Sequence, residues 1–264
     1  MFDWRPTARD VAPSQDDVFL SAPPRGQARR RPVLIILHQP HSVPGHIGAA
    51  LRELGHALDI RRPRFGDPLP PTLARHDGAI IFGGPMSAND PDDYIKQEIA
   101  FIGVALREEA PYLGVCLGGQ MLACHLGSCV GPHPDGHVEI GYHDVAPIAD
   151  VHGEGRWPQR VYQWHQEGFE LPAGAELIAA STGAFPNQAF RYGRTAVAIQ
   201  FHPEITYAMV SRWSGHNPQR LTLPGAQPRV QQMQDHIAHG PSVRAWLKRF
   251  LDGWVAAGRR RFSD

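Results

Sequence analysis

Strand-length segments alternate with helical stripes through the first half of the chain, and this alternation limits the possible folds more than any other feature. Residues 32–38, 79–82 and 112–115 are largely apolar runs, as expected for strands buried on both faces, and 56–60 is a shorter strand signal. Apolar residues recur at helical spacing over 47–54 and 95–106. The pattern predicts an α/β fold with a mostly parallel, doubly wound sheet and helices on both faces.

The second half of the chain has a different pattern. Short strands separated by Gly and Pro turns are predicted at residues 138–146, 160–164, 176–181 and 188–192, which indicates a small antiparallel extension. Residues 195–201 return to the buried sheet and place His202 at its carboxyl end. Ser242 is the predicted N-cap of a final amphipathic helix with apolar residues at helical spacing over 243–255.

The length of 264 residues allows one sizeable domain. Residues 1–31 are rich in Pro and Arg and lack periodic apolar positions, so we predict a flexible or peripheral extension there and a single domain over 32–264. The segment 215–227 is rich in Pro, Gly and polar residues. It is interpreted either as a partner surface or as a plain connection.

Charge and cysteine content exclude several classes of protein. Lys plus Arg and Asp plus Glu both total 26, so no net charge favours binding to nucleic acid or to a membrane surface. Three cysteines and an N-terminus without an apolar core segment indicate a reducing, cytoplasmic setting. No apolar run approaches the roughly 20 residues of a membrane-spanning helix. No Cys/His spacing forms a convincing zinc site, and we expect neither a metal nor a cofactor.

The segment Gly114-Val-Cys116-Leu-Gly118-Gly119-Gln120 lies where a buried strand ends and a helix begins. Glycines two residues before and two after Cys116 permit a sharp turn that projects its side chain above the sheet, and the helix N-terminus favours the thiolate. A buried structural cysteine is the other interpretation, because free cysteines are often buried. The glycines and the strand-to-helix context favour a nucleophile.

This segment resembles the nucleophile elbow of class I glutamine amidotransferases. Phe201-His202-Pro203-Glu204 matches a second signature of that family, and residues 82–87, Phe-Gly-Gly-Pro-Met-Ser, resemble its oxyanion loop. Residues 163–165 and 188–190 lie where members similar to GMP synthase carry related residues. The resemblance runs in consistent order from about residue 32 to the end and implies a flavodoxin-like fold.

A cysteine nucleophile needs a base, and the base needs a group that orients it, so His202 is the candidate base and Glu204 the candidate orienting carboxylate. An isolated histidine would more often be structural. Attack on an amide creates an oxyanion, which needs N–H donors, and the resemblance assigns these to the backbone amides of Gly84 and Leu117. It also places Gln120, Gly83 and His165 at the substrate, although Gln120 also fits a helix-packing role.

The resemblance implies that Cys116 forms a γ-glutamyl thioester and releases ammonia, after which His202 activates water to release glutamate. The chain has no Gly-x-x-x-x-Gly-Lys-Ser/Thr loop for an ATP-dependent synthetase. Two enzymes therefore remain: an amidotransferase that passes ammonia to a separate acceptor subunit, and a stand-alone γ-glutamyl hydrolase or peptidase that uses the same triad. A third interpretation, an inactive regulatory homologue, is disfavoured by the complete set of Cys116, His202 and Glu204.

Overall fold

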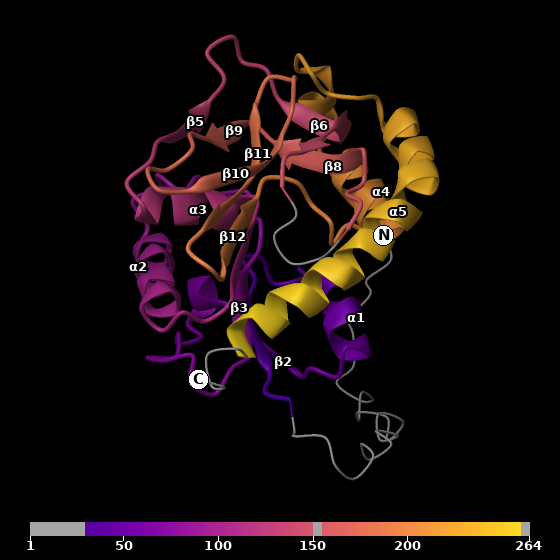
Figure 1. The fold of residues 1–264 in the computed structure, drawn as a ribbon. Helices are drawn as coiled ribbons and strands as arrows, with labels where there is room; N and C mark the ends of the chain where they lie inside the picture. Colours follow the sequence, from indigo (N-terminus) through magenta and orange to yellow (C-terminus); the bar gives the residue numbers. More distant parts are fainter. Residues whose placement is uncertain (1–29, 150–154, 260–264) are drawn as a thin grey trace, which may run out of the picture.

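The structure, a computed structural model, describes residues 30–149 and 155–259 (Figure 1). An eight-stranded sheet forms its centre, in the strand order β2-β1-β3-β4-β12-β11-β10-β7. The predicted extension at residues 1–31 falls almost wholly on residues 1–29, which lie outside the described residues. Among the described residues, no helix combines the length and the apolar character needed to cross a membrane.

Five neighbouring strands of the sheet run parallel, as the first half of the sequence predicts. They are β2 (Leu58–Arg61), β1 (Val33–Ile36), β3 (Gly78–Ile81), β4 (Tyr112–Val115) and β12 (Ala196–Ile199). Three antiparallel strands extend this sheet beyond β12: β11 (Asn187–Tyr192), β10 (Glu176–Ala180) and β7 (Ala146–Pro147). The predicted antiparallel extension is therefore present, and β12 is the return strand that precedes His202.

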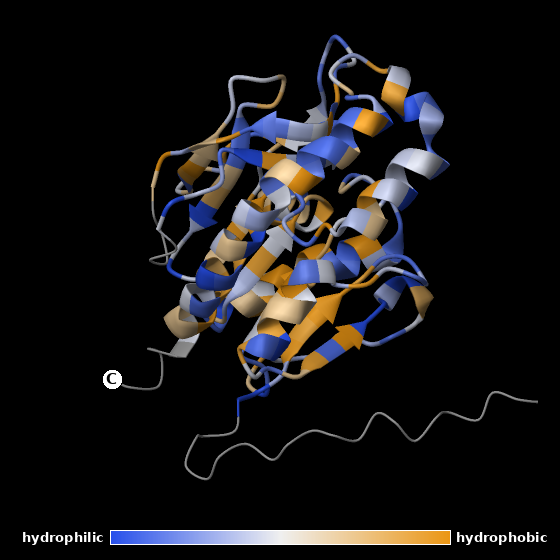
Figure 2. Ribbon diagram, turned by 90° about the vertical axis from the view of Figure 1, so that its right-hand side faces the viewer, coloured by the Kyte–Doolittle hydropathy of each residue, from blue (hydrophilic) through white to orange (hydrophobic). Residues whose placement is uncertain are grey.

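Helices cover both faces of the parallel strands. One face packs against α1 (Gly45–Glu53) and α5 (Arg229–Arg259), and the other against α2 (Asp93–Arg107) and α3 (Leu117–His125). Successive residues of β1 alternate between the two cores, since Ile35 belongs to the first and Ile36 to the second. Figure 2 shows these strands as an apolar layer within more polar helices. Burial on both faces explains why β1 is apolar at every position.

Two small antiparallel sheets lie beyond the carboxyl ends of the parallel strands (Figure 1). One joins β5 (Val130–Pro132) to β9 (Glu167–Phe169), and the other joins β6 (Glu139–Asp144) to β8 (Arg160–His165). The sequence predicted β6 and β8 but not β5 or β9, which are three residues each. The remaining elements are α4 (Tyr207–His216) and the 3₁₀ turns η2 (Pro63–Phe65) and η3 (Pro218–Thr222).

The prediction that Ser242 caps the final helix is wrong. Helix α5 begins at Arg229 and contains both Pro241 and Ser242, whose hydroxyl donates to the carbonyl of His239. A proline inside a helix costs about 3 kcal/mol, so the sequence indicates a break there. Packing on both sides offsets that cost. Tyr162 donates to Gln232 at 2.8 Å before the proline, and the apolar stripe that includes Trp246 is buried after it.

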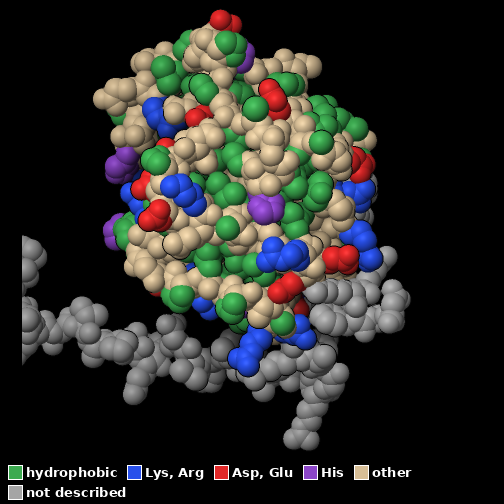
Figure 3. Space-filling view, turned by 90° about the vertical axis from the view of Figure 1, so that its left-hand side faces the viewer, with side chains coloured by type: hydrophobic (Ala, Val, Ile, Leu, Met, Phe, Trp, Pro, Cys, Tyr) green, Lys and Arg blue, Asp and Glu red, His purple; other side chains and the backbone are tan. Residues whose placement is uncertain are grey.

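The molecular surface around α2 carries acidic and basic side chains interspersed with apolar ones (Figure 3). This distribution agrees with the equal totals of acidic and basic residues in the chain. No charge of a single sign dominates the face that this view shows. A functional site is therefore expected at the carboxyl ends of the parallel strands, where doubly wound sheets bind their ligands.

Candidate active site

Cys116 lies on a strained turn between β4 and α3. Its φ of 51° and ψ of −106° put a non-glycine residue in a region that L-residues rarely adopt, at a cost of about 1–3 kcal/mol. The backbone on either side holds it there, since its N–H donates to the carbonyl of Ile199 and its own carbonyl accepts from Gln120 N–H. Strain maintained in this way at an element junction is typical of functional turns.

The glycines around Cys116 are required by close backbone contacts. A Cβ atom at Gly114 would lie 2.3 Å from the carbonyl oxygen of Gly118, and one at Gly118 would lie 2.1 Å from the carbonyl oxygen of Ile81. Either methyl group would push α3 away from the sheet. The sequence interpretation of these two glycines is thus explained by contact distances.

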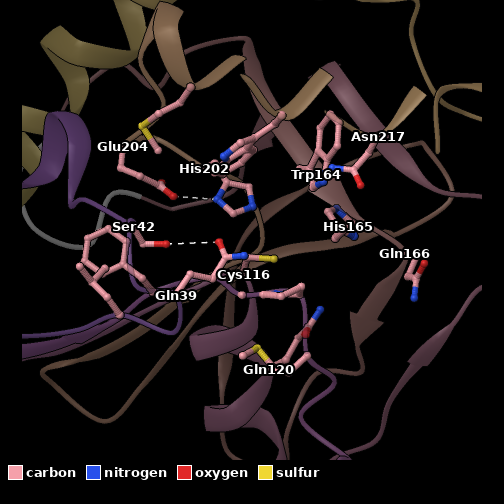
Figure 4. A pocket seen from close by; sticks show the side chains of 18 of the residues that line it. Gln39, Ser42, Cys116, Gln120, Trp164, His165, Gln166, His202, Glu204 and Asn217 are labelled. Atoms are coloured by element: carbon pink, nitrogen blue, oxygen red, sulfur yellow. Dashed lines mark hydrogen bonds and ion pairs between the residues drawn. The ribbon is translucent and has the colours of Figure 1, made fainter. Parts of the chain in front are cut away.

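His202 and Glu204, both from the segment after β12, lie beside Cys116 and are buried (Figure 4). His202 Nδ1 donates to Glu204 Oε1 at 2.8 Å, and Figure 4 shows the ring between Glu204 and Cys116. His202 Nε2 has no hydrogen-bond partner among the described residues. Nε2 is therefore free for a proton from the cysteine or the substrate, a contact that often tightens only when substrate binds.

Electrostatics keep His202 charged despite its burial. Burial alone would lower its pKa, but the charges of Glu204 and Cys116 outweigh that effect and raise the pKa to about 10. The geometry therefore stabilises an imidazolium next to the sulfur atom. An imidazolium at this position can protonate a leaving nitrogen.

The first helix after β1 supports Glu204. The backbone N–H of His46 donates to the carbonyl oxygen of Glu204 at 2.8 Å. Gly45 makes the closest approach, because a Cβ there would lie 2.0 Å from that oxygen, and its φ of +49° also suits glycine. Elements from both halves of the chain thus fix the carboxylate that orients His202.

Two buried amides extend the contacts of Cys116. Gln200 Nε2 donates to Cys116 Sγ at 3.6 Å, a weak bond that favours negative charge on sulfur. Gln120 Nε2 donates to the carbonyl of Glu167 at 2.8 Å and lies 3.3 Å from Gln200 Oε1. Gln120 lines the cavity, yet its amide is already bonded, so the packing role left open by the sequence is also present.

The loop after β3 brings Gly83 and Gly84 to the site. A Cβ at Gly83 would lie 2.8 Å from His202 Cε1 and 3.4 Å from Cys116 Cβ, so this glycine lets the loop approach both side chains. The N–H of Gly84 has no hydrogen-bond partner among the described residues. Leu117 is the first residue of α3, so its N–H has no acceptor within the helix. Both amides remain available to an oxyanion.

His165 is buried in a polar network behind the cavity. Its Nδ1 lies 3.0 Å from the carbonyl of Glu167, and its Nε2 lies 3.2 Å from Glu139 Oε2. Glu139 also accepts from Gln188 at 2.9 Å. Burial raises the pKa of Glu139, but the contacts with His165 and Gln188 outweigh burial and lower it. The ring of His165 is thus held by protein partners, and its backbone remains the part that faces a ligand.

These residues surround a cavity of about 310 Å³, the lower end of the range for small-molecule sites. In Figure 4, Glu204, Gln39 and Ser42 lie on one side of Cys116, and Trp164, His165, Gln166 and Asn217 lie on the other. All of the residues assigned from the sequence belong to this region. Those that line the cavity directly are Cys116, His202, Glu204, Gly83, Gly84, Gln120 and His165, and Leu117 follows Cys116.

Sequence reasoning missed Gln200, His38 and Arg220, which also lie in or behind this site. Gln200 and His38 closely follow β12 and β1, so their position at strand ends was an available signal. Arg220 comes from η3, in the segment 215–227 that had no assigned role. A separate cluster of His133, Asp135 and His137, with ligand atoms within 4.8 Å of one another, lies on the β5–β6 loop outside the cavity lining.

Comparisons with known proteins agree with this geometry. The family model for glutamine amidotransferase class-I matches residues 41–209. YfeJ of Salmonella typhimurium, described as a glutamine amidotransferase-like protein, is 25% identical over 83% of this chain and 95% of its own. One of the subunits of the glutamine-hydrolyzing GMP synthase of Ignicoccus hospitalis is 30% identical over 61% of this chain and 82% of its own.

Solved structures show the same likeness. The crystal structure of a glutamine amidotransferase from Methylobacillus flagellatus superposes with a TM-score of 0.80 at 29% identity, covering 86% of this chain and 95% of that one. The chain matches longer proteins only in part. It spans 31% of the glutamine-hydrolyzing GMP synthase of Aliarcobacter butzleri, with 31% identity over 61% of this chain.

Proposed function

Because the chain belongs to the class-I glutamine amidotransferase family, we propose that it hydrolyses the side-chain amide of glutamine through a thioester on Cys116. One observation carries the proposal. Cys116 stands on a strained strand-to-helix turn at the base of a cavity, beside a buried His202 that Glu204 holds at 2.8 Å. A nucleophile, a base and an orienting group in this order are the requirements for covalent catalysis.

In the first half-reaction, the Cys116 thiolate attacks the side-chain amide carbon of glutamine. The carbonyl π electrons move to oxygen, and the free amides of Gly84 and Leu117 would stabilise that oxyanion. The imidazolium of His202 then gives its proton to the amide nitrogen. The C–N bond breaks, ammonia leaves, and the γ-glutamyl group remains on sulfur as a thioester.

In the second half-reaction, neutral His202 takes a proton from a water molecule while the water oxygen attacks the thioester carbon. The same amides hold the second oxyanion. Collapse of this intermediate breaks the C–S bond, which gives glutamate and returns the thiolate and imidazolium pair. Gln200, which donates to Sγ, stabilises the leaving sulfur.

The fate of the ammonia is the next part of the proposal. One relative is named as one subunit of a glutamine-hydrolyzing GMP synthase, which divides the work between chains. The ammonia formed here would likewise pass to an acceptor site on a separate subunit. Residues 32–264 would form the amidotransferase domain, with residues 1–31 as a peripheral extension. The unpaired cysteines suit a reducing compartment, so a cytoplasmic location belongs to the same proposal.

Steady-state assays of ammonia and glutamate test the proposal. The purified protein should release both in equal amounts from glutamine and neither from asparagine, whose amide is one methylene closer to the α-carbon. The C116A variant provides the background rate. Equal rates for wild type and C116A, with both proteins folded, would show that Cys116 is not the nucleophile.

A further inference from the structure

Arg220 is a cation in the cavity that the proposed chemistry does not use. Its guanidinium lies over the ring of Trp164, 5.9 Å from the ring centroid, and Nη2 donates to Gln166 Oε1 at 3.3 Å. Its Nε is buried without a hydrogen-bond partner among the described residues. Burial lowers the pKa of Arg220, and the charge of Cys116 opposes that shift.

The carboxylates that line the same cavity have other partners. Glu204 accepts from His202, and Glu167 accepts from the hydroxyl of Ser87 at 3.2 Å. Within the described residues, no ion pair involves Arg220. A half-buried cation without a partner is costly, and Arg carries a planar set of donors that matches a carboxylate in bidentate geometry. An anionic ligand would supply the missing acceptors.

We propose that Arg220 binds a carboxylate of the γ-glutamyl substrate. The inference rests on the proposed function and specifies its substrate. Two carboxylates have the required chemistry: the α-carboxylate of the glutamyl group, and a carboxylate on the leaving group of a γ-glutamyl peptide. The first source belongs to glutamine hydrolysis, and the second to a γ-glutamyl hydrolase. In both cases the η3 segment, Pro218–Thr222, supplies substrate specificity.

Four substrates separate these sources: glutamine, glutamine α-amide, γ-glutamylglycine and γ-glutamylglycine amide. The wild type should discriminate by roughly 10- to 100-fold in kcat/KM against whichever amide lacks the recognised carboxylate. R220Q should lose that discrimination, and R220K should keep part of it, because lysine retains the charge without the planar donors. R229Q is the matched control, since Arg229 bonds Ser211 outside the cavity.

Discrimination by R220Q equal to that of the wild type would overturn this inference while leaving the cysteine chemistry intact. Failure of the proposed function looks different. In that case neither the wild type nor C116A would turn over any of the four compounds. A loss of discrimination confined to the α-amides identifies the α-carboxylate, and one confined to the glycine compounds identifies the leaving group.

A second, independent observation concerns the orientation of the Gly83–Gly84 peptide. His38 Nδ1 lies 3.1 Å from the carbonyl oxygen of Gly83. A carbonyl can only accept, so Nδ1 must carry the hydrogen atom. In a trans peptide the C=O and the next N–H point in opposite directions, so the N–H of Gly84 points away from His38. A side chain at Gly84 would also lie 3.1 Å from His38 Cβ.

His38 is itself held by a buried carboxylate. Its Nε2 lies 2.7 Å from Glu98 Oε2, and both side chains are fully buried. Glu98 comes from α2, on the opposite face of the sheet from α1 and α5. This contact fixes the ring and, through it, the Gly83 carbonyl. We infer that the His38–Glu98 pair is a positioning device that keeps the Gly84 N–H directed at the developing oxyanion.

The test replaces the pair without leaving a buried charge. H38L/E98L should lower kcat by roughly 10- to 100-fold, less than or comparable to the loss of a whole oxyanion donor, with KM little changed. Affinity for glutamate γ-semialdehyde, which forms a tetrahedral adduct with cysteine, should fall more than affinity for glutamate. E98Q keeps the His38 donor and should show the same split at smaller size, which preserves the test if the double variant does not fold.

Alkylation of Cys116 by iodoacetamide provides the internal control, because it needs no oxyanion. Its rate should be unchanged in E98Q. Equal weakening of the aldehyde and of glutamate, or parallel changes in kcat and KM, would show that the pair has only a structural role.

Discussion

The two halves of the molecule contribute to the site in different ways. The parallel half, β1 to α3, contributes Cys116 and the backbone amides of Gly84 and Leu117, all placed by tight turns at strand ends. The later half contributes side chains: His202 and Glu204 after β12, and Arg220 from η3. The first contribution depends on local backbone geometry, whereas the second depends on contacts between residues far apart in the chain. Substitutions in each half should therefore fail differently.

Removal of the nucleophile should have the largest effect. C116A should reduce glutaminase activity by roughly 10⁴- to 10⁶-fold, because the acyl step has no other acceptor. C124A is the matched control, since Cys124 lies on the same helix α3 outside the cavity lining. Initial rates of ammonia release check both variants. A comparable loss in C124A would mean that the helix, rather than the Cys116 thiol, limits activity.

Neutralising the orienting carboxylate should come next. E204Q keeps the size of the side chain but removes the charge that raises the pKa of His202 to about 10. Activity should fall by roughly 10²- to 10⁴-fold. An NMR titration of His202 should show its proton lost at lower pH in E204Q than in the wild type. An unchanged titration would mean that Glu204 does not set the charge of His202.

A methyl group at the contact between the halves should have a smaller effect on activity. In G83A the new Cβ would lie 2.8 Å from His202 Cε1, so the histidine must move. We expect a loss of roughly 10- to 10³-fold in kcat, with the thermal midpoint of unfolding shifted by a few degrees. G131A is the control, because a Cβ at Gly131 meets no atom within 4 Å. Equal kcat values for the two variants would contradict the contact.

The smallest effect should come from the buried network of the later half. The pKa of Glu139 is lowered, so its ionised form stabilises the fold above pH 4.5, the ordinary value, and this contribution disappears as pH falls through the lowered value. E139Q should lower the free energy of unfolding by roughly 1–3 kcal/mol at pH 7. Urea unfolding from pH 7 to pH 3 should show the gap between wild type and E139Q narrowing. A constant gap would contradict an ionised Glu139.

The same contrast explains what the sequence could predict. The elbow was predictable because Gly114 and Gly118, two residues from Cys116, are required by contacts within a single turn. The parallel order of the first four strands followed from alternation of strands and helices. The assignment of His202 and Glu204 needed the family resemblance in addition, because nothing local says that β12 pairs with β4.

Partners distant in sequence were beyond pattern reading. His38 and Glu98 are 60 residues apart, Gln200 and Cys116 are 84 apart, and Arg220 and Gln166 are 54 apart. Each pair depends on the tertiary arrangement rather than on spacing. The helix start at Ser242 failed for the same reason, since contacts on both sides of Pro241 override the local signal for a break.

The central claim is that both halves together make Cys116 a nucleophile for the amide carbon of the glutamine side chain. Peptide mass spectrometry after incubation with 6-diazo-5-oxo-norleucine, a glutamine analogue that alkylates such nucleophiles, tests it most directly. The account predicts one covalent adduct, on Cys116 and not on Cys124 or Cys129, formed more slowly in E204Q. A folded protein with an unmodified Cys116, or with adducts distributed over all three cysteines, would contradict it.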